Sequence, residues 1–286
     1  MATPIVVAGI KLDIYGLEEY RARKQNDPVS VLFSMHGRLG TAQGMKDVNE
    51  KLEQLNSKPS TSSQSNRFLL VVSFDHANHG SRLVDNNRNL AWKDKDYDNE
   101  SHAIDMWAME KAAADTVTML IDVLEFYLFP KAESHIVQYG VLGFSLGGHS
   151  AYLASSNDKR LSLCVALVGC ADYESLLRYR ATSLNLTAQA PHIPERFIQH
   201  VVRKQDTIHN AQNLLRIKLL MINGQEDRLV PAECNASFVE KMRLSHTGSE
   251  GKHWASVVLP GLGHAWSDKM IQLCEQWCYD WLQESV

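Results

Sequence analysis

Residues 139–151 are Tyr139-Gly140-Val141-Leu142-Gly143-Phe144-Ser145-Leu146-Gly147-Gly148-His149-Ser150-Ala151, and this stretch decides the fold. The apolar run before Gly143 predicts a buried strand, and the residues from about Gly147 onward predict a helix. The pattern Gly-x-Ser-x-Gly between them predicts a sharp strand-to-helix turn with Ser145 at its tip. Larger side chains at Gly143 and Gly147 would collide with the strand and the helix, so both positions have to be small.

This turn has the pattern of a nucleophile elbow. A serine at its tip projects from the carboxyl edge of the sheet, in front of a helix amino terminus whose N–H groups favour developing negative charge. The same five-residue pattern also fits a glycine-rich turn with an idle serine. The rest of the chain therefore has to supply a base, an acid that orients it and a second oxyanion donor.

Length and composition limit the alternatives. The 286 residues are enough for one α/β domain, which we predict to span residues 1–286. A net charge of −4 gives no reason to expect nucleic acid or an anionic membrane as a partner. Neither a signal peptide nor an apolar run of membrane-spanning length is evident, and the five cysteines are an odd number that favours a reduced core. We therefore expect a cytoplasmic location.

Apolar runs alternate with segments of helical periodicity along the chain. Strands are predicted over residues 5–14, 31–35, 68–74, 136–142, 161–168, 217–222 and 254–259, and helices over 45–55, 101–129, 231–244 and 268–282. Continuous apolar strands that alternate with helices indicate a mostly parallel sheet covered on both faces. The polar connection 83–100 is long for a compact domain, and it is either a functional rim or an ordered excursion.

Residues 171–214 interrupt this alternation after the strand at 161–168. Helical patches in this segment are broken by Pro191 and Pro194. We predict a small helical cap insertion over Ser145, with Leu177, Tyr179 and Phe197 facing inward and its arginines, including Arg178 and Arg180, facing outward. The alternative is a surface excursion that packs on the flank of the sheet.

A serine, an acid and a histidine follow three different strands. Ligands bind beyond the carboxyl ends of parallel strands, and Ser145, Asp227 and His264 all occur there. A serine hydroxyl needs a base within hydrogen-bond reach, histidine suits that role near neutral pH, and a carboxylate fixes the imidazole tautomer. Glu226 is a rival for the acid, but the spacing to Val230-Pro231 favours Asp227.

These motifs resemble the α/β-hydrolase family, with a likeness to esterases and dienelactone hydrolases over nearly the whole chain. The resemblance rests on His36-Gly37, Gly143-x-Ser145-x-Gly147, Gly224-x-x-Asp227-x-x-Val230-Pro231 and Gly263-His264, with a further likeness in Asp75-x-x-x-His79-Gly80-x-Arg82. It implies an α/β fold with a central, mostly parallel sheet of about eight strands. It also implies that Ser145 is the nucleophile, His264 the base and Asp227 its orienting acid, with an oxyanion hole on the backbone N–H groups of Arg38 and Leu146.

We therefore expect a serine hydrolase that cleaves an ester, thioester or lactone of a small hydrophobic molecule, without a metal or other cofactor. His76 and His79 are three residues apart, but they lie on a loop without a complete metal-binding pattern, so a metal site is not expected there. Candidates for the substrate pocket are Phe144, Leu177, Phe197 and Trp266.

Several alternatives remain open. The same residues fit an acyltransferase, a thioesterase or a C–C bond hydrolase, and the fold also serves non-enzymatic binding proteins. Peptidase activity is less expected because no propeller or other module precedes the hydrolase residues. A homodimer is left open.

Overall fold

The computed structural model describes residues 1–23, 27–59, 67–93, 97–187 and 189–284. In these residues eight strands form one sheet in the order β1-β2-β4-β3-β5-β6-β7-β8. The strands are β1 Thr3–Val7, β2 Ile10–Tyr15, β3 Val29–Met35, β4 Phe68–Phe74, β5 Ile136–Phe144, β6 Leu161–Leu167, β7 Lys218–Gly224 and β8 Trp254–Leu259. β3 to β8 pair in parallel, and β1 and β2 pair antiparallel at one edge. This is the α/β-hydrolase fold predicted from the sequence.

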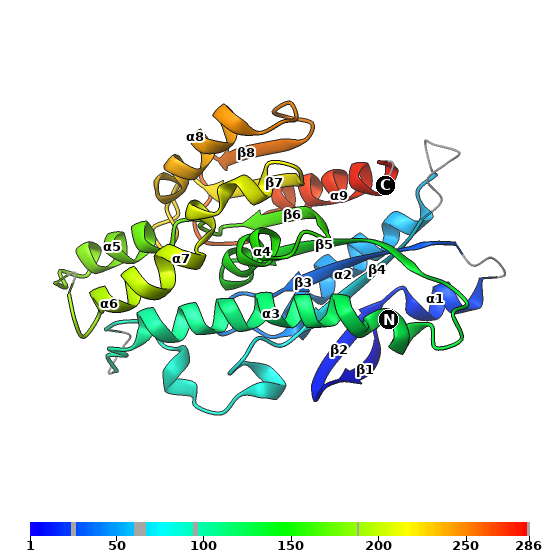
Figure 1. The fold of residues 1–286 in the computed structure, drawn as a ribbon, viewed down its shortest axis with the longest axis horizontal. Coiled ribbons are helices and arrows are strands. Elements are labelled where there is room, and N and C mark those ends of the chain that lie inside the picture. The colour runs from blue at the N-terminus through cyan, green and yellow to red at the C-terminus, as the bar shows by residue number, and fades with distance from the viewer. Residues whose placement is uncertain (24–26, 60–66, 94–96, 188, 285–286) are drawn as a thin grey trace.

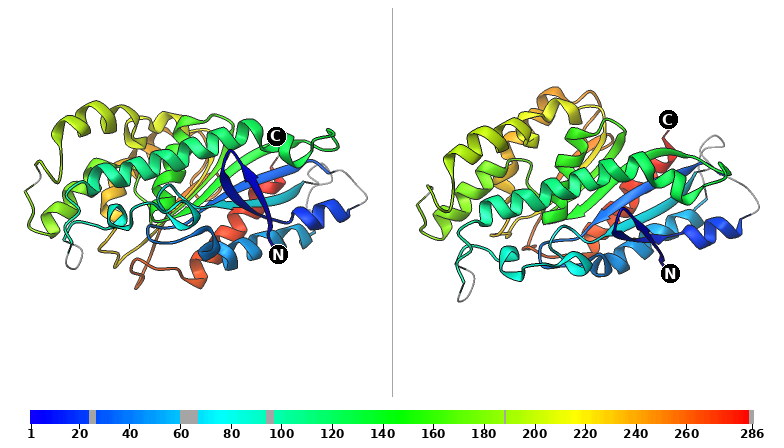
Figure 2. Two further views of the ribbon diagram at one scale, coloured as in Figure 1. Left: turned by 90° about the horizontal axis from the view of Figure 1, so that it is seen from below. Right: turned by 60° about the horizontal axis from the view of Figure 1, so that its bottom comes forward.

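Helices cover both faces of the sheet (Figures 1 and 2). Their bounds are α1 Leu17–Ala22, α2 Lys46–Glu53, α3 His102–Leu128, α4 Leu146–Asn157, α5 Tyr173–Ser183, α6 Glu195–Phe197, α7 Arg203–Gln205, α8 Ala236–Ser245 and α9 Asp268–Gln283. α3 and α4 lie on one face, and α2 and α9 lie on the other (Figure 2).

The strand residues divide between the two faces because successive side chains of a strand point in opposite directions. In β3, Phe33 packs into the core beneath α3 and α4, whereas Leu32 packs into the core beneath α2 and α9. Every residue of β3, β4 and β7 is buried, which explains why their sequences are mostly apolar and do not alternate regularly with polar residues. The five cysteines are free and buried, in accordance with the expected reduced core.

One prediction at the amino terminus is wrong, and one helix there was missed. Residues 5–14 form two strands instead of one, because the chain reverses at Ala8 and Gly9, which have φ of 50° and 77°. Glycine adopts positive φ at no steric cost, which suits Gly9 to this tight turn. The short helix α1, which begins after Gly16 at φ 87°, was not predicted.

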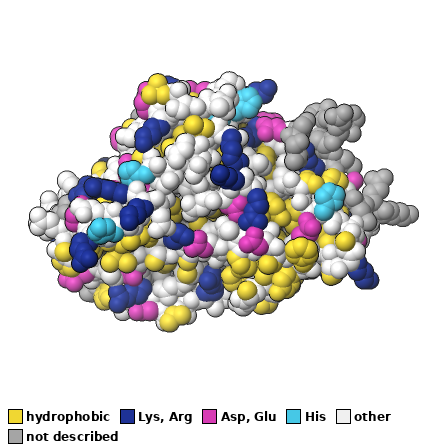
Figure 3. All heavy atoms as spheres, in the orientation of Figure 1, with side chains coloured by type: hydrophobic (Ala, Val, Ile, Leu, Met, Phe, Trp, Pro, Cys, Tyr) yellow, Lys and Arg dark blue, Asp and Glu magenta, His cyan; other side chains and the backbone are white. Residues whose placement is uncertain are grey.

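The segment between β6 and β7 contains α5, α6 and α7. These helices lie beyond the carboxyl ends of the central strands, beside the amino-terminal half of α3 (Figure 1). The Tyr173 hydroxyl donates to Ala103 O, and Trp107 contacts both Tyr173 and Phe197 through its ring. Lys and Arg side chains lie next to Asp and Glu side chains on the outer surface there (Figure 3), where Arg178 and Arg203 both pair with Glu174.

Candidate active site

Ser145 occupies the turn between β5 and α4, as the sequence predicts. Its backbone has φ 55° and ψ −114°, a strained conformation for a residue with a side chain. A Cβ at Gly143 would lie 2.0 Å from Gly147 O, and a Cβ at Gly147 would lie 2.2 Å from Met35 O. Both glycines are therefore required, because backbone approaches each of them too closely for any side chain.

Ser145, His264 and Asp227 form one chain of hydrogen bonds. His264 Nε2 lies 2.8 Å from Ser145 Oγ, and His264 Nδ1 lies 2.7 Å from Asp227 Oδ2. The three residues come from the loops after β5, β8 and β7. His264 can therefore accept the Ser145 proton on one ring nitrogen while Asp227 holds the proton on the other.

Asp227 is buried and stays ionised. Its Oδ1 accepts the backbone N–H groups of Leu229 and Val230, both at 2.8 Å. Burial alone would raise the pKa of Asp227, but hydrogen bonds from His264 and from Val230 N–H outweigh burial and lower it. The neighbouring Glu226 is exposed, so the structure places Asp227 rather than Glu226 beside the histidine.

Leu146 and Arg38, whose N–H groups are expected to form the oxyanion hole, both lie beside Ser145. Leu146 is the first residue of α4, and the first N–H groups of a helix have no acceptor within the helix. The turn that carries Arg38 packs on the serine, since a Cβ at Gly37 would lie 3.4 Å from Ser145 Cβ. Arg38 and Leu146 both line the cavity at Ser145.

Buried histidines hold this turn in place. His36 Nδ1 donates to Gly37 O at 2.7 Å, while His36 Nε2 accepts the His76 N–H at 3.0 Å. Burial lowers the pKa of His36 to about 4, so its ring is neutral at neutral pH. His79 contacts Ala77 O through Nδ1 at 3.0 Å. No group of three potential metal ligands occurs among the described residues.

A cavity of about 240 Å³ opens beside Ser145. It is lined by apolar residues from several elements, by two arginines and by two histidines: Gly37, Arg38, Leu39, Met106, Phe144, Ser145, Leu146, His149, Arg180, Leu229 and His264. A second cavity of about 140 Å³ shares Arg38, Arg180 and Leu229 with the first. The space available to a substrate is thus a small apolar chamber with cationic residues at the junction between the two cavities.

The predicted pocket residues are only partly correct. Phe144 lines the cavity, and Trp266 stacks behind it with ring centroids 4.5 Å apart. Leu177 is a core residue with no exposure, and Phe197 packs against Trp107 instead of reaching the cavity. Both lie on segments that face α3, so their apolar character serves packing.

Arg180 and His149 are among the cavity residues that were not predicted. Arg180 was expected to face outward, but Tyr173, Leu176 and Leu177 place it on the buried face of α5, since it follows them by seven, four and three residues. His149 follows Ser145 by four residues, and its N–H donates to Ser145 O at 3.0 Å. Helical spacing in the sequence therefore indicated that both residues could face the cavity.

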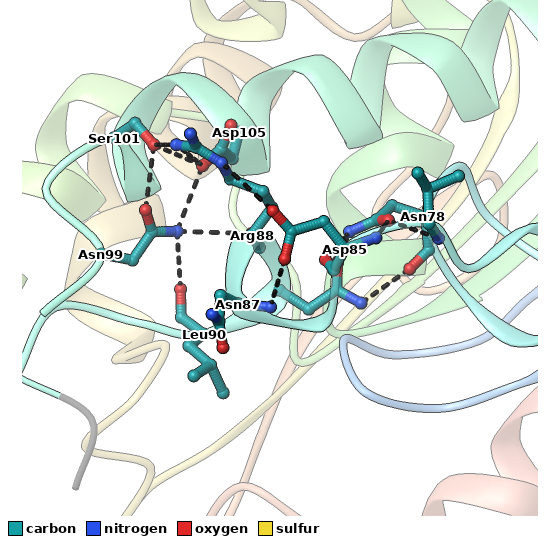
Figure 4. Close-up of polar contacts among 10 residues, drawn as sticks. Asn78, Asp85, Asn87, Arg88, Leu90, Asn99, Ser101 and Asp105 are labelled. Atoms are coloured by element: carbon teal, nitrogen blue, oxygen red, sulfur yellow. Dashed lines mark hydrogen bonds and ion pairs between the residues drawn. The ribbon is translucent and has the colours of Figure 1, made fainter. Parts of the chain in front are cut away.

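The long connection between β4 and α3 forms a wall of the second cavity. Asn78 Oδ1 accepts the N–H groups of Val84 and Asp85, and Asn99 Nδ2 donates to Leu90 O (Figure 4). Asn89, which accepts a hydrogen bond from Asn78, also accepts one from Arg38 Nη1 through its carbonyl oxygen. The connection is thus ordered by its own asparagines and fixes the Arg38 side chain.

The fold and the serine–histidine–aspartate geometry define a serine hydrolase of the α/β-hydrolase superfamily. A family model described as the prolyl oligopeptidase family matches residues 132–286, and the chain belongs to this family. No curated protein matches the chain. None of the helices in the described part of the chain has the length and apolarity that a membrane span requires.

Solved structures share the fold at low sequence identity. TT1662 from Thermus thermophilus has a TM-score of 0.66 at 16% identity, with 100% of this chain and 99% of that chain covered. A putative dienelactone hydrolase from Klebsiella pneumoniae has a TM-score of 0.59 at 13% identity, with 100% and 98% covered. An acylaminoacyl peptidase from Pyrococcus horikoshii has a TM-score of 0.55 at 11% identity, and the match covers 99% of this chain but 39% of that one.

Proposed function

We propose that this protein hydrolyses a carboxylic ester, thioester or lactone of a small molecule through an acyl-enzyme on Ser145. The observation that carries the proposal is the continuous hydrogen-bond chain from Ser145 Oγ through His264 to Asp227. A serine with an oriented base is an activated nucleophile, and the elbow presents it beside backbone N–H donors.

In the first half of the reaction, Ser145 Oγ attacks the carbonyl carbon while His264 Nε2 takes its proton. The carbonyl oxygen becomes an oxyanion, which the N–H groups of Leu146 and Arg38 stabilise. When the bond to the leaving group breaks, His264 returns the proton to that group. Water then attacks the acyl-enzyme by the same route, with His264 as base. Side chains and backbone of this chain handle every proton and charge, so the proposal invokes no cofactor.

The cavity supports a small substrate. Its volume of about 240 Å³ is below the range of about 300–1,000 Å³ that is usual for pockets of drug-sized ligands. Met106, Phe144 and Leu229 give it apolar walls. Residues 171–214 act as a cap in this proposal, because α5 from that segment contributes Arg180 to the cavity. The free, buried cysteines support the cytoplasmic location that the sequence favours.

A peptide bond is the second candidate for the scissile group. The family model and the fold shared with an acylaminoacyl peptidase favour it. The small cavity favours a small ester, since its volume of about 240 Å³ lies below the usual range for ligand pockets. Acyl transfer and C–C cleavage use the same residues and differ in the acceptor or the bond broken.

Labelling of Ser145 tests the proposal. A fluorophosphonate probe should add once per chain, and Ser145→Ala should abolish the adduct in intact mass spectra without changing the circular dichroism spectrum. Short alkyl esters and N-acylated peptides should then be compared as substrates. Labelling that persists in Ser145→Ala, or cleavage of peptides with no cleavage of esters, would contradict it.

A further inference from the structure

Arg180 lies at the junction of the two cavities beside the catalytic serine. It is partly buried, lines both cavities, and is carried there by the inner face of α5. Its Nε donates to Leu229 O at 3.0 Å, and its Nη1 lies 3.2 Å from the Met106 sulfur. A carbonyl oxygen and a thioether, which is a weak acceptor, are thus its hydrogen-bond partners in the described chain.

No described carboxylate lies within 4.0 Å of the Arg180 guanidinium. The carboxyl groups that interact with it at longer range are Glu110 and Asp227. Burial raises the pKa of Glu110 well above its usual range, so Glu110 is neutral, and Asp227 is bound to His264. A desolvated cation without a contact ion pair is costly, and a bound anion would offset that cost.

The arginines elsewhere in the same segment show the contrast. Arg178 and Arg203 face outward and pair with Glu174 at 2.7 and 2.8 Å. A cleft of about 390 Å³ at the opposite edge of the sheet is also basic, but Arg160 and Lys218 there pair with Asp158 and Glu284. Arg180 differs from these residues in facing a cavity without such a partner.

His149 adds a neutral hydrogen-bond donor to the same cavity. Its Nδ1 accepts the Cys170 N–H at 2.8 Å, which leaves the ring proton on Nε2. Burial and the neighbouring Arg180 lower the pKa of His149 to about 3, so the ring keeps this neutral form at neutral pH. Arg38 and Arg180 extend the positive lining into the second cavity, where Arg228 is added.

From this arrangement we infer that the substrate carries a carboxylate a few bonds from its scissile carbonyl, and that Arg180 binds this carboxylate while Ser145 attacks. The inference rests on the proposed ester hydrolysis and narrows its substrate class to acidic esters, such as half-esters of short dicarboxylic acids. Met106, Phe144 and Leu229 contact the methylene chain between the two ends. Arg180 is thus a specificity-determining residue that touches substrate away from the reacting atoms.

A matched pair of esters tests the inference. Monoethyl glutarate and ethyl pentanoate have the same leaving group and chain length, and they differ by a carboxylate in place of a terminal methyl group. The wild-type protein should prefer monoethyl glutarate in kcat/KM by about tenfold to a hundredfold, the factor that a hydrogen bond to a charged group supplies. Arg180→Met should lower this ratio to near one. Arg196→Met, on the exposed side of the same segment, should leave the ratio unchanged.

A second measurement separates this inference from the proposed function. Glutarate should slow fluorophosphonate labelling of Ser145 in the wild-type protein and not in Arg180→Met, whereas neutral pentanamide should affect both alike. If ethyl pentanoate is cleaved at least as well as monoethyl glutarate, the inference fails and the proposed function stands. If neither ester is cleaved while Ser145 labels, ester hydrolysis fails, and protection by glutarate decides whether the anion site exists. Equal protection by glutarate in the wild-type protein and in Arg180→Met would overturn the assignment of Arg180 as the carboxylate-binding residue.

Discussion

Asp227 uses its two carboxylate oxygens for different purposes. Oδ2 binds His264, whereas Oδ1 accepts two backbone N–H groups from residues 229 and 230. The second set of bonds fixes the carboxylate plane, so the bond to His264 is aimed before any substrate arrives. This explains the spacing from Asp227 to Val230-Pro231, since the chain has to turn back to bring two N–H groups to one oxygen.

Asp227→Ala should therefore lower kcat by about 10³–10⁴-fold, because His264 loses the partner that fixes its tautomer. Adding His264→Ala should cost little more, since residues that act as a unit are not additive. Steady-state kinetics on the preferred ester would measure both effects. Glu226→Ala is the matched control and should be close to wild type. If Glu226→Ala is inactive while Asp227→Ala keeps its activity, the acid is misassigned.

At the scale of elements, the buried face of α5 packs on the core, and one side chain of this helix, Arg180, is proposed to bind the substrate. Its first turn is held by Asp172, which accepts the Ser175 N–H at 3.0 Å. Tyr173, Leu176 and Leu177 then anchor the helix on the core, and Arg180 reaches the cavity one turn later. The apolar residues of the segment thus position a cation rather than forming the pocket wall themselves.

Two substitutions separate these roles. Leu177→Ala should lower the free energy of unfolding by about 2–5 kcal/mol, as expected for a buried leucine, and should leave the relative rates on short and bulky esters unchanged. Leu229→Ala should change the relative rates on short and bulky esters and cost little stability, because Leu229 is 37% exposed and lines both cavities. Urea unfolding and a series of esters of increasing acyl length would measure the two effects. A changed ester profile in Leu177→Ala would show that Leu177 reaches the substrate after all.

Motifs confined to a few residues could be predicted from the sequence, and contacts between distant segments could not. Local spacing predicts the turn at Ser145 and the bounds of α3. It also predicts that Asp227 and His264 each follow a strand. Leu177 and Phe197 were misplaced because their apolar character is the same whether they face α3 or a cavity. Met106 reaches the cavity from α3, and nothing in its local sequence distinguishes it from the core methionines.

The molecule as a whole buries ionisable groups in their neutral forms near the site. Burial lowers the pKa of five histidines below their ordinary value of 6.5, namely His36, His76, His79, His102 and His149. Burial also raises the pKa of Glu110 well above 4.5 and that of Asp206 to about 8. The histidines give up protons on folding and the two acids keep theirs, so the two sets respond to pH with opposite signs.

These two sets predict a maximum of stability near pH 6.5. Below that pH the unfolded chain binds protons on these histidines and the folded protein does not. Five histidines outweigh two acids, so acidification lowers the free energy of unfolding. Well above it the histidines are neutral in both states, but Glu110 and Asp206 still hold protons that the unfolded chain has lost, so stability falls as pH rises toward 8. Each uncompensated group contributes up to about 1.4 kcal/mol per pH unit. Urea midpoints at pH 5, 6.5 and 8 would measure the curve.

Glu110→Gln isolates the alkaline side of this curve. Glutamine has nearly the shape of the protonated acid and needs no proton, so the variant should gain stability relative to wild type as pH rises from 5 to 8. The loss on the acidic side depends on the histidines and should remain. Glu110 Oε1 has no hydrogen-bond partner within the described chain, so the substitution breaks no bond to that atom. A stability difference between Glu110→Gln and wild type that stays constant from pH 5 to pH 8 would show that Glu110 is ionised in the folded protein. The assignment of a neutral Glu110 near Arg180 would then be wrong.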